Sequence, residues 1–366
     1  MQFEDPLFWI HLNIEHPFSL TGILFFPKLK NQIEIHKDKI QLYQNQVFVT
    51  DNIEGIVPEF LNLLRGVIDS PDIPLNVSRS YLQADATVKK IAGYITRKVG
   101  DKIEGLFKTQ REELEKKWED IKIILEYGML SEDSFFNQIK NTFLYQAVDG
   151  HYYTFEEFTK KIEAKQKNKE GKLIYLYSSN KEYQHSYIQL ALDKGYEVLI
   201  FDSPLSPHII QKLEVDIKDI SFVRVDADHI NKLIEKEESS HSKLSEEEKQ
   251  ELNKILEEHI DKKKFTFSLE DLDSQSNPFM ITINEFMRRM KEMNMANGGM
   301  FSGTLPDTYM IVVNTNHPLI TKIIQEKNDE IRKQTLKHSI DLAMLSQNLL
   351  QGENLTHFIN RSFEKL

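Results

Sequence analysis

Residues 66–83 read GVIDSPDIPLNVSRSYLQ, and here an apolar, proline-punctuated run ends and a long helical pattern begins. Because strand-like segments precede this joint and helical segments follow it, the sequence predicts an α/β layer domain. Arg79 stands at the joint, and its guanidinium keeps its charge and offers five donors in a fixed fork. At the mouth of a helix such a group can bind an anion, most commonly a phosphate. The alternative is an ordinary surface arginine, with Ser80 and Gln83 forming a capping box.

The segment before the joint carries the patterns of β-strands. Residues 8–14 alternate with period two, and residues 20–26 form a continuous apolar run. Residues 40–43 and 46–49 bracket a two-residue hairpin at 44–45. Residues 58–68 are predicted as a helix with a proline in its first turn. Four aromatic side chains on the first two strands form either the sheet core or a binding surface: Phe8, Trp9, Phe25 and Phe26.

Helical and mixed patterns follow the joint. Apolar residues recur at helical spacing over 88–106 and again over 114–125. Capping boxes start helices at Thr154 and at Ser245, because a glutamate stands three residues after each. Strand patterns at 173–177, 196–201 and 220–225 alternate with helices, which predicts a small parallel sheet. Neither turn of this unit carries a Gly-rich phosphate loop, so we interpret it as structural. Residues 265–269, 279–283 and 309–313 predict three more strands before a helical tail.

Composition excludes several classes of function. The 366 residues carry a net charge of -11, so no basic excess is available to neutralise nucleic-acid phosphates. The chain has no Cys, which excludes disulfides and thiolate metal sites. No apolar run approaches the ~20 residues of a membrane span. The histidines form no metal-binding pair, so we expect no metal site. Because there is no apolar span, no signal-peptide pattern at the N-terminus and no Cys, we expect no membrane association and a cytoplasmic location.

Four stretches of the sequence, in this order, resemble the middle domain of the heat-shock protein 90 chaperone family, bacterial high-temperature protein G type. They are residues 5–8 (DPLF), 20–28 (LTGILFFPK), 47–51 (VFVTD) and 66–79 (GVIDSPDIPLNVSR). The resemblance continues more weakly to the C-terminus. It implies a middle domain at 1–226, with a large α/β part at 1–108, a helical coil at 109–150 and a small α/β part at 151–226. A C-terminal dimerisation domain would then occupy 227–366, within an α+β multidomain chain.

The same resemblance implies a role for the joint. Arg79 and Gln83 match the catalytic loop that reaches an ATP, with its Mg ion, held in a preceding domain. We expect that domain to be absent here, so that this chain alone is inactive as an ATPase. The family's C-terminal Met-Glu-Glu-Val-Asp tail is also absent, so co-chaperones that recognise it are not expected.

A methionine-rich stretch at 284–300 is the second candidate site. It holds Phe286, Met287, Met290 and Met293, interleaved with basic residues, and Asn-Gly-Gly follows at 297–299. Flexible thioethers suit adaptable binding surfaces, although a stripe of this kind also suits a core. The resemblance implies an exposed amphipathic helix that binds clients, with Phe286, Met290 and Met293 at its apolar positions. Asn294 stands where relatives carry another apolar residue.

The helical tail is the third candidate site. Its last two apolar stripes include Ile340, Met344, Leu355, Phe358 and Ile359. Few residues remain in the chain to cover them, so a four-helix interface with a second copy would bury these faces. Packing against the sheet of residues 265–313 is the alternative. The family dimerises at these positions.

We therefore interpret the sequence as the middle and C-terminal part of an ATP-dependent, homodimeric chaperone for unfolded or partly folded clients. A stand-alone dimeric holdase that binds unfolded chains without ATP is the second hypothesis, although it leaves Arg79 without a role. A small-molecule hydrolase or transferase would need a catalytic constellation that the sequence does not contain.

Overall fold

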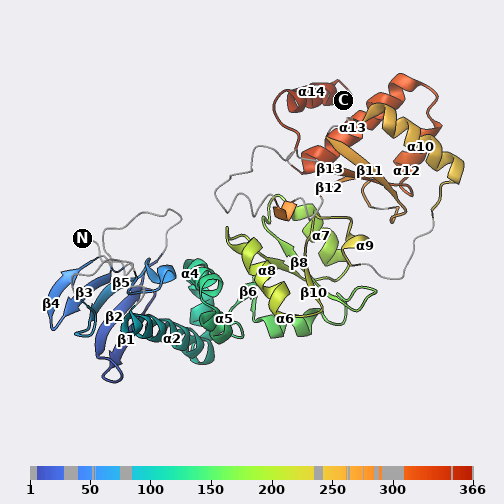
Figure 1. Ribbon diagram of the computed structural model, residues 1–366. Coiled ribbons are helices and arrows are strands. Elements are labelled where there is room, and N and C mark those ends of the chain that lie inside the picture. The colour runs from blue at the N-terminus through green and yellow to red at the C-terminus, as the bar shows by residue number, and fades with distance from the viewer. Residues whose placement is uncertain are drawn as a thin grey trace. The chain divides into compact units, whose positions relative to one another are not determined.

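The computed structural model describes residues 6–28, 40–51, 53, 55–74, 85–234, 242–260, 262, 264–274, 276–283, 288–290, 309–347 and 349–364. The chain divides into two compact units (Figure 1). Unit 1 comprises Met1–Tyr145 and Tyr152–Phe158, and unit 2 comprises Gln146–His151 and Thr159–Leu366. Both units mix helices with sheets, as the sequence predicts. The boundary predicted at 226/227 falls inside unit 2 and stays a prediction.

Unit 1 contains a five-stranded mixed sheet in the order β1-β2-β5-β3-β4. Its strands are β1 (Phe8–Ile14), β2 (Leu20–Phe26), β3 (Ile40–Gln44), β4 (Val47–Thr50) and β5 (Arg65–Asp69). All pairings are antiparallel except that of β3 with β5, which is parallel. Asn45 and Gln46, both with positive φ, connect β3 to β4. The predicted hairpin is therefore present, one residue further along the chain.

The predicted helix at 58–68 is wrong. Only the single 3-10 turn η1 (Glu59–Leu61) forms, and residues 65–69 become the central strand β5. Gly66 permits this arrangement, because its φ is +145° and a Cβ there would lie 2.0 Å from the carbonyl oxygen of Ile23. Pairing with two neighbouring strands overrides the local helical pattern.

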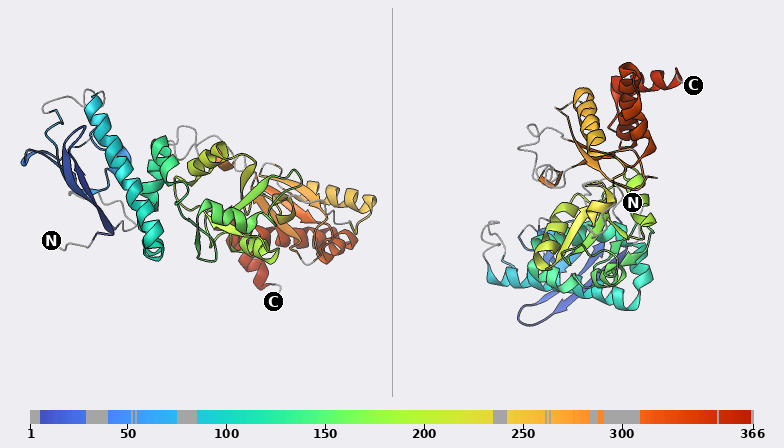
Figure 2. Two further views of the ribbon diagram at one scale, coloured as in Figure 1. Left: turned by 90° about the horizontal axis from the view of Figure 1, so that it is seen from below. Right: turned by 90° about the vertical axis from the view of Figure 1, so that its right-hand side faces the viewer.

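Helices follow the sheet of unit 1 along the chain. They are α2 (Ala86–Thr109), α3 (Arg111–Lys116), α4 (Trp118–Ser131) and α5 (Asp133–Ile139). α2 lies along the sheet (Figure 2). It buries Ile91, Ile95, Val99 and Ile103, as the helical spacing predicts. The Tyr94 hydroxyl on α2 donates to the Asn13 carbonyl on β1 at 3.0 Å, which fixes the helix to the sheet.

A short strand pair and one helix follow α5, and the boundary between the units crosses them. They are β6 (Tyr145–Gln146), β7 (Tyr152–Tyr153) and α6 (Phe155–Ile162). The capping box predicted at Thr154 is present. Its hydroxyl accepts from the Glu157 amide at 3.2 Å, and the Glu157 carboxylate accepts from the Thr154 amide at 2.8 Å.

Unit 2 begins with a small parallel sheet in the order β10-β8-β9, as the sequence predicts. Its strands are β8 (Leu173–Ser178), β9 (Val198–Ile200) and β10 (Ile220–Arg224). The helices of this part are α7 (His185–Asp193), α8 (Ser206–Asp216) and α9 (Ile230–Leu233). β10 is an edge strand, so the backbone groups on its outer side have no strand partner in this sheet.

The second part of unit 2 is a three-stranded sheet in the order β11-β13-β12 with helices on it (Figure 1). Its elements are α10 (Glu246–His259), β11 (Phe265–Glu270), β12 (Phe279–Ile283), β13 (Tyr309–Asn314), α12 (Pro318–Gln325), α13 (Asp329–Ser346) and α14 (Gly352–Phe363). The predicted capping box at Ser245 and Glu248 starts α10. Apolar side chains of α10, α12 and α13 form one core with β12 and β13. Among the residues that the structure describes, no helix combines the length and apolar character needed to cross a membrane.

Candidate functional site

Arg79 and Gln83 lie outside the described residues, but both sides of their segment are well anchored. Before it, the Asp72 carboxylate accepts from the Ser19 amide at 2.7 Å, and the Ser70 hydroxyl donates to the Ser19 carbonyl at 2.6 Å. After it, the Asp85 carboxylate accepts from the amides of Thr87 and Val88 at 2.8 and 3.0 Å and caps α2. The segment therefore connects a turn fixed to the sheet with the capped start of a long helix.

The four N-terminal aromatic residues separate into two classes. Phe8 and Phe26 are in the core, with ring centroids 4.2 Å apart. Neither ring is accessible to a client in the folded chain, because Phe8 is 5% exposed and Phe26 is fully buried. Trp9 is 57% exposed, and Phe25, its partner in the register of β1 and β2, is half-buried. Alternation along the strand explains the difference, since neighbouring side chains point to opposite faces.

In the methionine-rich stretch the structure describes residues 288–290, which are helical. Phe286, Met287 and Met293 lie outside the described residues. Met290 is half-buried. Arg288 is only 6% exposed and donates to the Tyr177 hydroxyl on β8 at 2.6 Å. A buried guanidinium keeps its charge, so such acceptors are essential to its stability there.

Arg289 binds the outer edge of β10. Its guanidinium donates to the Glu214 carboxylate on α8 at 2.8 and 3.3 Å, and also donates to the Phe222 carbonyl. The Glu214 carboxylate in turn accepts from the Phe222 amide at 2.7 Å. Arg289 and Glu214 therefore satisfy both backbone groups of an edge-strand residue, and they fix residues 288–290 to the small parallel sheet.

The predicted dimer residues differ in exposure. Ile340 belongs to the core of unit 2 and Met344 packs against it, so both contribute to the packing that the sequence offers as the alternative. Phe358 is buried and stacks on His338 with centroids 5.1 Å apart. Leu355 is half-buried and Ile359 is 43% exposed.

Five large apolar side chains on α13 and α14 are exposed, and one of them, Ile331 (50% exposed), lies in the first turn of α13. We call the other four the C-terminal apolar residues: Leu342 (49% exposed), Leu345 (38%), Ile359 (43%) and Phe363 (70%). An ion pair between Asp341 on α13 and Arg361 on α14 joins the two helices. Apolar side chains of this size on two adjoining helices are typical of an interaction surface.

Comparison with known proteins identifies the family. The family model described as Hsp90 protein matches residues 1–359. The chain belongs to the heat-shock protein 90 family. This member is 50% identical over 332 residues to Chaperone protein HtpG of Porphyromonas gingivalis (strain ATCC 33277), covering 90% of this chain and 48% of that protein. It is 41% identical to Chaperone protein HtpG of Bacteroides thetaiotaomicron, covering 99% of this chain and 63% of the relative. The Endoplasmin homolog of Arabidopsis thaliana is 23% identical over 95% of this chain.

This heat-shock protein 90 chain thus spans about half to two thirds of the length of the relatives it matches. Three of the C-terminal apolar residues, Leu342, Leu345 and Phe363, are not among the residues predicted for the dimer interface. Their spacing could have indicated them, because Phe363 follows Ile359 by four positions and Leu345 follows Leu342 by three, which places each pair on one face of a helix. Within the described residues, no group of three His, Asp or Glu side chains is arranged to hold a metal ion.

Proposed function

We propose that this chain is the middle and C-terminal part of a cytoplasmic, homodimeric, ATP-driven chaperone that binds unfolded or partly folded client proteins. The exposure of the C-terminal apolar residues is the observation that carries the proposal. Their removal from water would contribute roughly 25 cal/mol per Å² of apolar area. A two-fold pairing of α13 and α14 between copies would cover them. We retain the division into domains at 226/227 as part of this proposal.

Client binding is assigned to the methionine-rich stretch. The proposed residues are Phe286, Met287, Met290 and Met293, together with exposed Trp9 and half-buried Phe25. Two contacts support this assignment. Arg288 donates to the Tyr177 hydroxyl and Arg289 to the Glu214 carboxylate, which fixes residues 288–290 to the small parallel sheet. Met290 in the same segment stays half-buried. Flexible methionine side chains can adapt to many different client surfaces.

ATP would be bound by a domain outside this chain, together with its Mg ion. We propose that Arg79 stabilises the negative charge on the γ-phosphate during hydrolysis and that Gln83 orders the segment around it. The anchored turn before this segment and the capped helix after it support this role for Arg79, because an arginine that contacts a phosphate must be held in a fixed position.

The test compares two variants of the full-length protein, one at Arg79 and one in the methionine-rich stretch. Arg79→Ala should reduce ATP turnover by about 10²-fold or more while leaving nucleotide and client affinity nearly unchanged. Phe286→Ser with Met290→Ser should weaken binding of a denatured model enzyme while leaving basal turnover and the dimer intact. ATP turnover and client binding are both measured on every variant, and client binding is measured as suppression of the aggregation of the denatured enzyme.

Two results would contradict the proposal. Unchanged turnover in Arg79→Ala would remove the arginine from the reaction, and unchanged client binding in the double variant would return the methionine-rich stretch to a structural role. If the full-length protein suppressed aggregation equally well with and without ATP, the ATP-independent holdase would be the better description.

A further inference from the structure

A solvent-open cavity of about 700 Å³ lies beside α12, away from the sites described above. We call it the α12 groove, and its lining comprises Lys243, Asn316, Pro318, Thr321, Lys322, Gln325, Glu326 and Lys327. Its residues at 318, 321, 322 and 325 follow helical spacing, so they occupy one face of α12.

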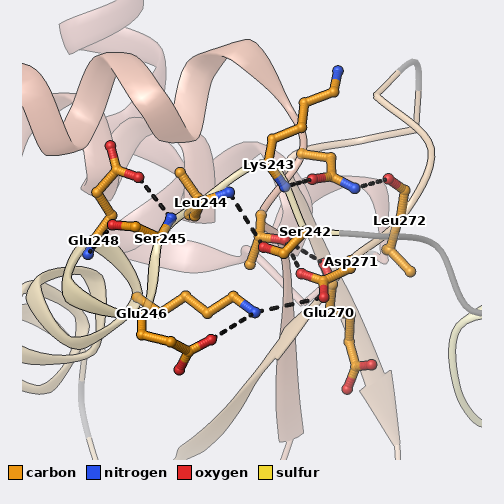
Figure 3. Close-up of polar contacts among 12 residues, drawn as sticks. Ser242, Lys243, Leu244, Ser245, Glu246, Glu248, Glu270, Asp271 and Leu272 are labelled. Atoms are coloured by element: carbon orange, nitrogen blue, oxygen red, sulfur yellow. Dashed lines mark hydrogen bonds and ion pairs between the residues drawn. The ribbon is translucent and has the colours of Figure 1, made fainter.

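The floor of the groove is held by a buried polar network. Asn316 is only 8% exposed, and its side chain accepts from the Lys243 amide at 2.7 Å and donates to the Leu272 carbonyl at 2.9 Å (Figure 3). The capping box of Ser245 and Glu248 follows at once. The backbone at Lys243 is therefore fixed, and Figure 3 shows its ammonium group pointing away from this network.

The groove carries an unbalanced positive charge. Lys243, Lys322 and Lys327 are exposed, and none of them forms an ion pair with any residue that the structure describes. Nearby Lys249 differs, because Asp271 and Glu246 lie 3.6 and 3.7 Å from its ammonium. Glu326 also lines the groove, where its carboxylate accepts from the Asn328 amide at 2.9 Å, so three ammonium groups stand against one carboxylate. Three ammonium groups thus face solvent together in a chain of net charge -11.

We propose that the α12 groove binds an acidic segment of a partner polypeptide in an extended conformation. Charge-assisted hydrogen bonds from the three ammonium groups would be made to its carboxylates. The eight residues of α12 span roughly 12 Å, which matches about four residues of extended chain. Because the rest of the chain is acidic, its field would repel such a segment elsewhere and favour this position. The proposal does not depend on chaperone activity.

The test uses fluorescein-labelled hexaglutamate as the probe, with binding followed by fluorescence anisotropy. We expect saturable binding that weakens as salt is raised, and about tenfold lower affinity for Lys322→Gln with Lys327→Gln. The matched control, Lys254→Gln with Lys333→Gln, removes the same charge from exposed positions outside the groove and should bind within about twofold of the parent. All substituted side chains are exposed, so folding should be unaffected.

A second measurement locates the peptide without any substitution. An amine-reactive reagent with mass spectrometry should report protection of Lys243, Lys322 and Lys327 by hexaglutamate, with Lys254 and Lys333 unprotected. Equal loss of affinity in both double variants, equal protection of all five lysines, or no binding of the peptide would overturn the proposal. Competition by inorganic phosphate at a similar concentration would show a general anion site and would overturn the assignment to a polypeptide.

Discussion

At the scale of single residues, the pair of Arg111 and Glu157 is the clearest electrostatic interaction in unit 1. The Arg111 guanidinium donates to both oxygens of the Glu157 carboxylate at 2.5 and 2.8 Å and lowers the pKa of Glu157 to about 2. The same contact raises the pKa of Arg111. The pair joins α3 to the start of α6, and the Glu157 side chain is 41% exposed. Solvent screening therefore limits its contribution to about 1 kcal/mol.

Glu157→Gln tests this contribution. Gln retains an oxygen for the cap on Thr154 but removes the charge. In the unfolded chain the carboxyl titrates near 4.5, and in the folded chain near 2. The stabilisation is therefore complete above about pH 4.5, and it is lost as pH falls towards 2, because the unfolded state takes up the proton first. We expect Glu157→Gln to lower the free energy of unfolding by about 1 kcal/mol at pH 7, with the deficit disappearing near pH 2.

Tryptophan fluorescence during urea unfolding is the appropriate measurement. The chain has only two tryptophans, Trp9 and Trp118, and both are in unit 1, so the signal reports this unit alone. Glu112→Gln on α3 is the control, since Glu112 is exposed. A deficit of equal size at pH 7 and pH 2 would show that the lost stability does not come from the ion pair.

At the scale of elements, features that depend on residues close together in the sequence are predicted correctly, whereas features that depend on distant residues are not. The capping boxes at Thr154 and Ser245 are present, because each depends on residues three positions apart. The helix predicted at 58–68 fails, because β5 is created by pairing with β2 and β3 from distant parts of the chain. Likewise, no local pattern shows that Arg289 and Glu214 meet at the edge of β10. The start of α2 is capped by Asp85, whereas the predicted box at Ser80 and Gln83 lies outside the described residues.

The edge of β10 gives the prediction at this scale. Arg289→Met removes the donor to the Phe222 carbonyl and the ion-pair partner of Glu214 while keeping an apolar stem. We expect amide hydrogen exchange over residues 220–225 to become about tenfold faster, because a hydrogen bond to a charged group contributes roughly 1.5–3 kcal/mol.

Exchange is measured by mass spectrometry, with peptides from α2 as the internal reference. Lys218→Met, at an exposed position in the turn before β10, is the matched control and should leave the exchange unchanged. If Arg289→Met left β10 as protected as in the parent, the tether of residues 288–290 to this sheet would be energetically unimportant.

At the scale of the whole molecule, the family that the sequence motifs resemble is the family whose model matches residues 1–359. The packing of the C-terminal helices narrows the set of residues proposed for the dimer surface. Ile340 and Phe358 are buried within the chain, so the proposed interface shifts to Leu342, Leu345 and Phe363 beside Ile359. Periodicity identifies apolar stripes, but it cannot separate a stripe's inner edge from its outer edge. Only the packed positions of α13 and α14 make that distinction.

The most direct test of the proposed dimer is the molar mass of this chain in solution, measured by light scattering over a concentration series. We predict a stable mass of twice 43.0 kDa. Leu345→Glu with Phe363→Glu should reduce it to a single 43.0 kDa chain, while Val215→Glu, at an 80% exposed apolar position on α8, should leave the dimer intact. A monomeric parent at every concentration, or a double variant that still dimerises, would contradict the claim that α13 and α14 join two copies.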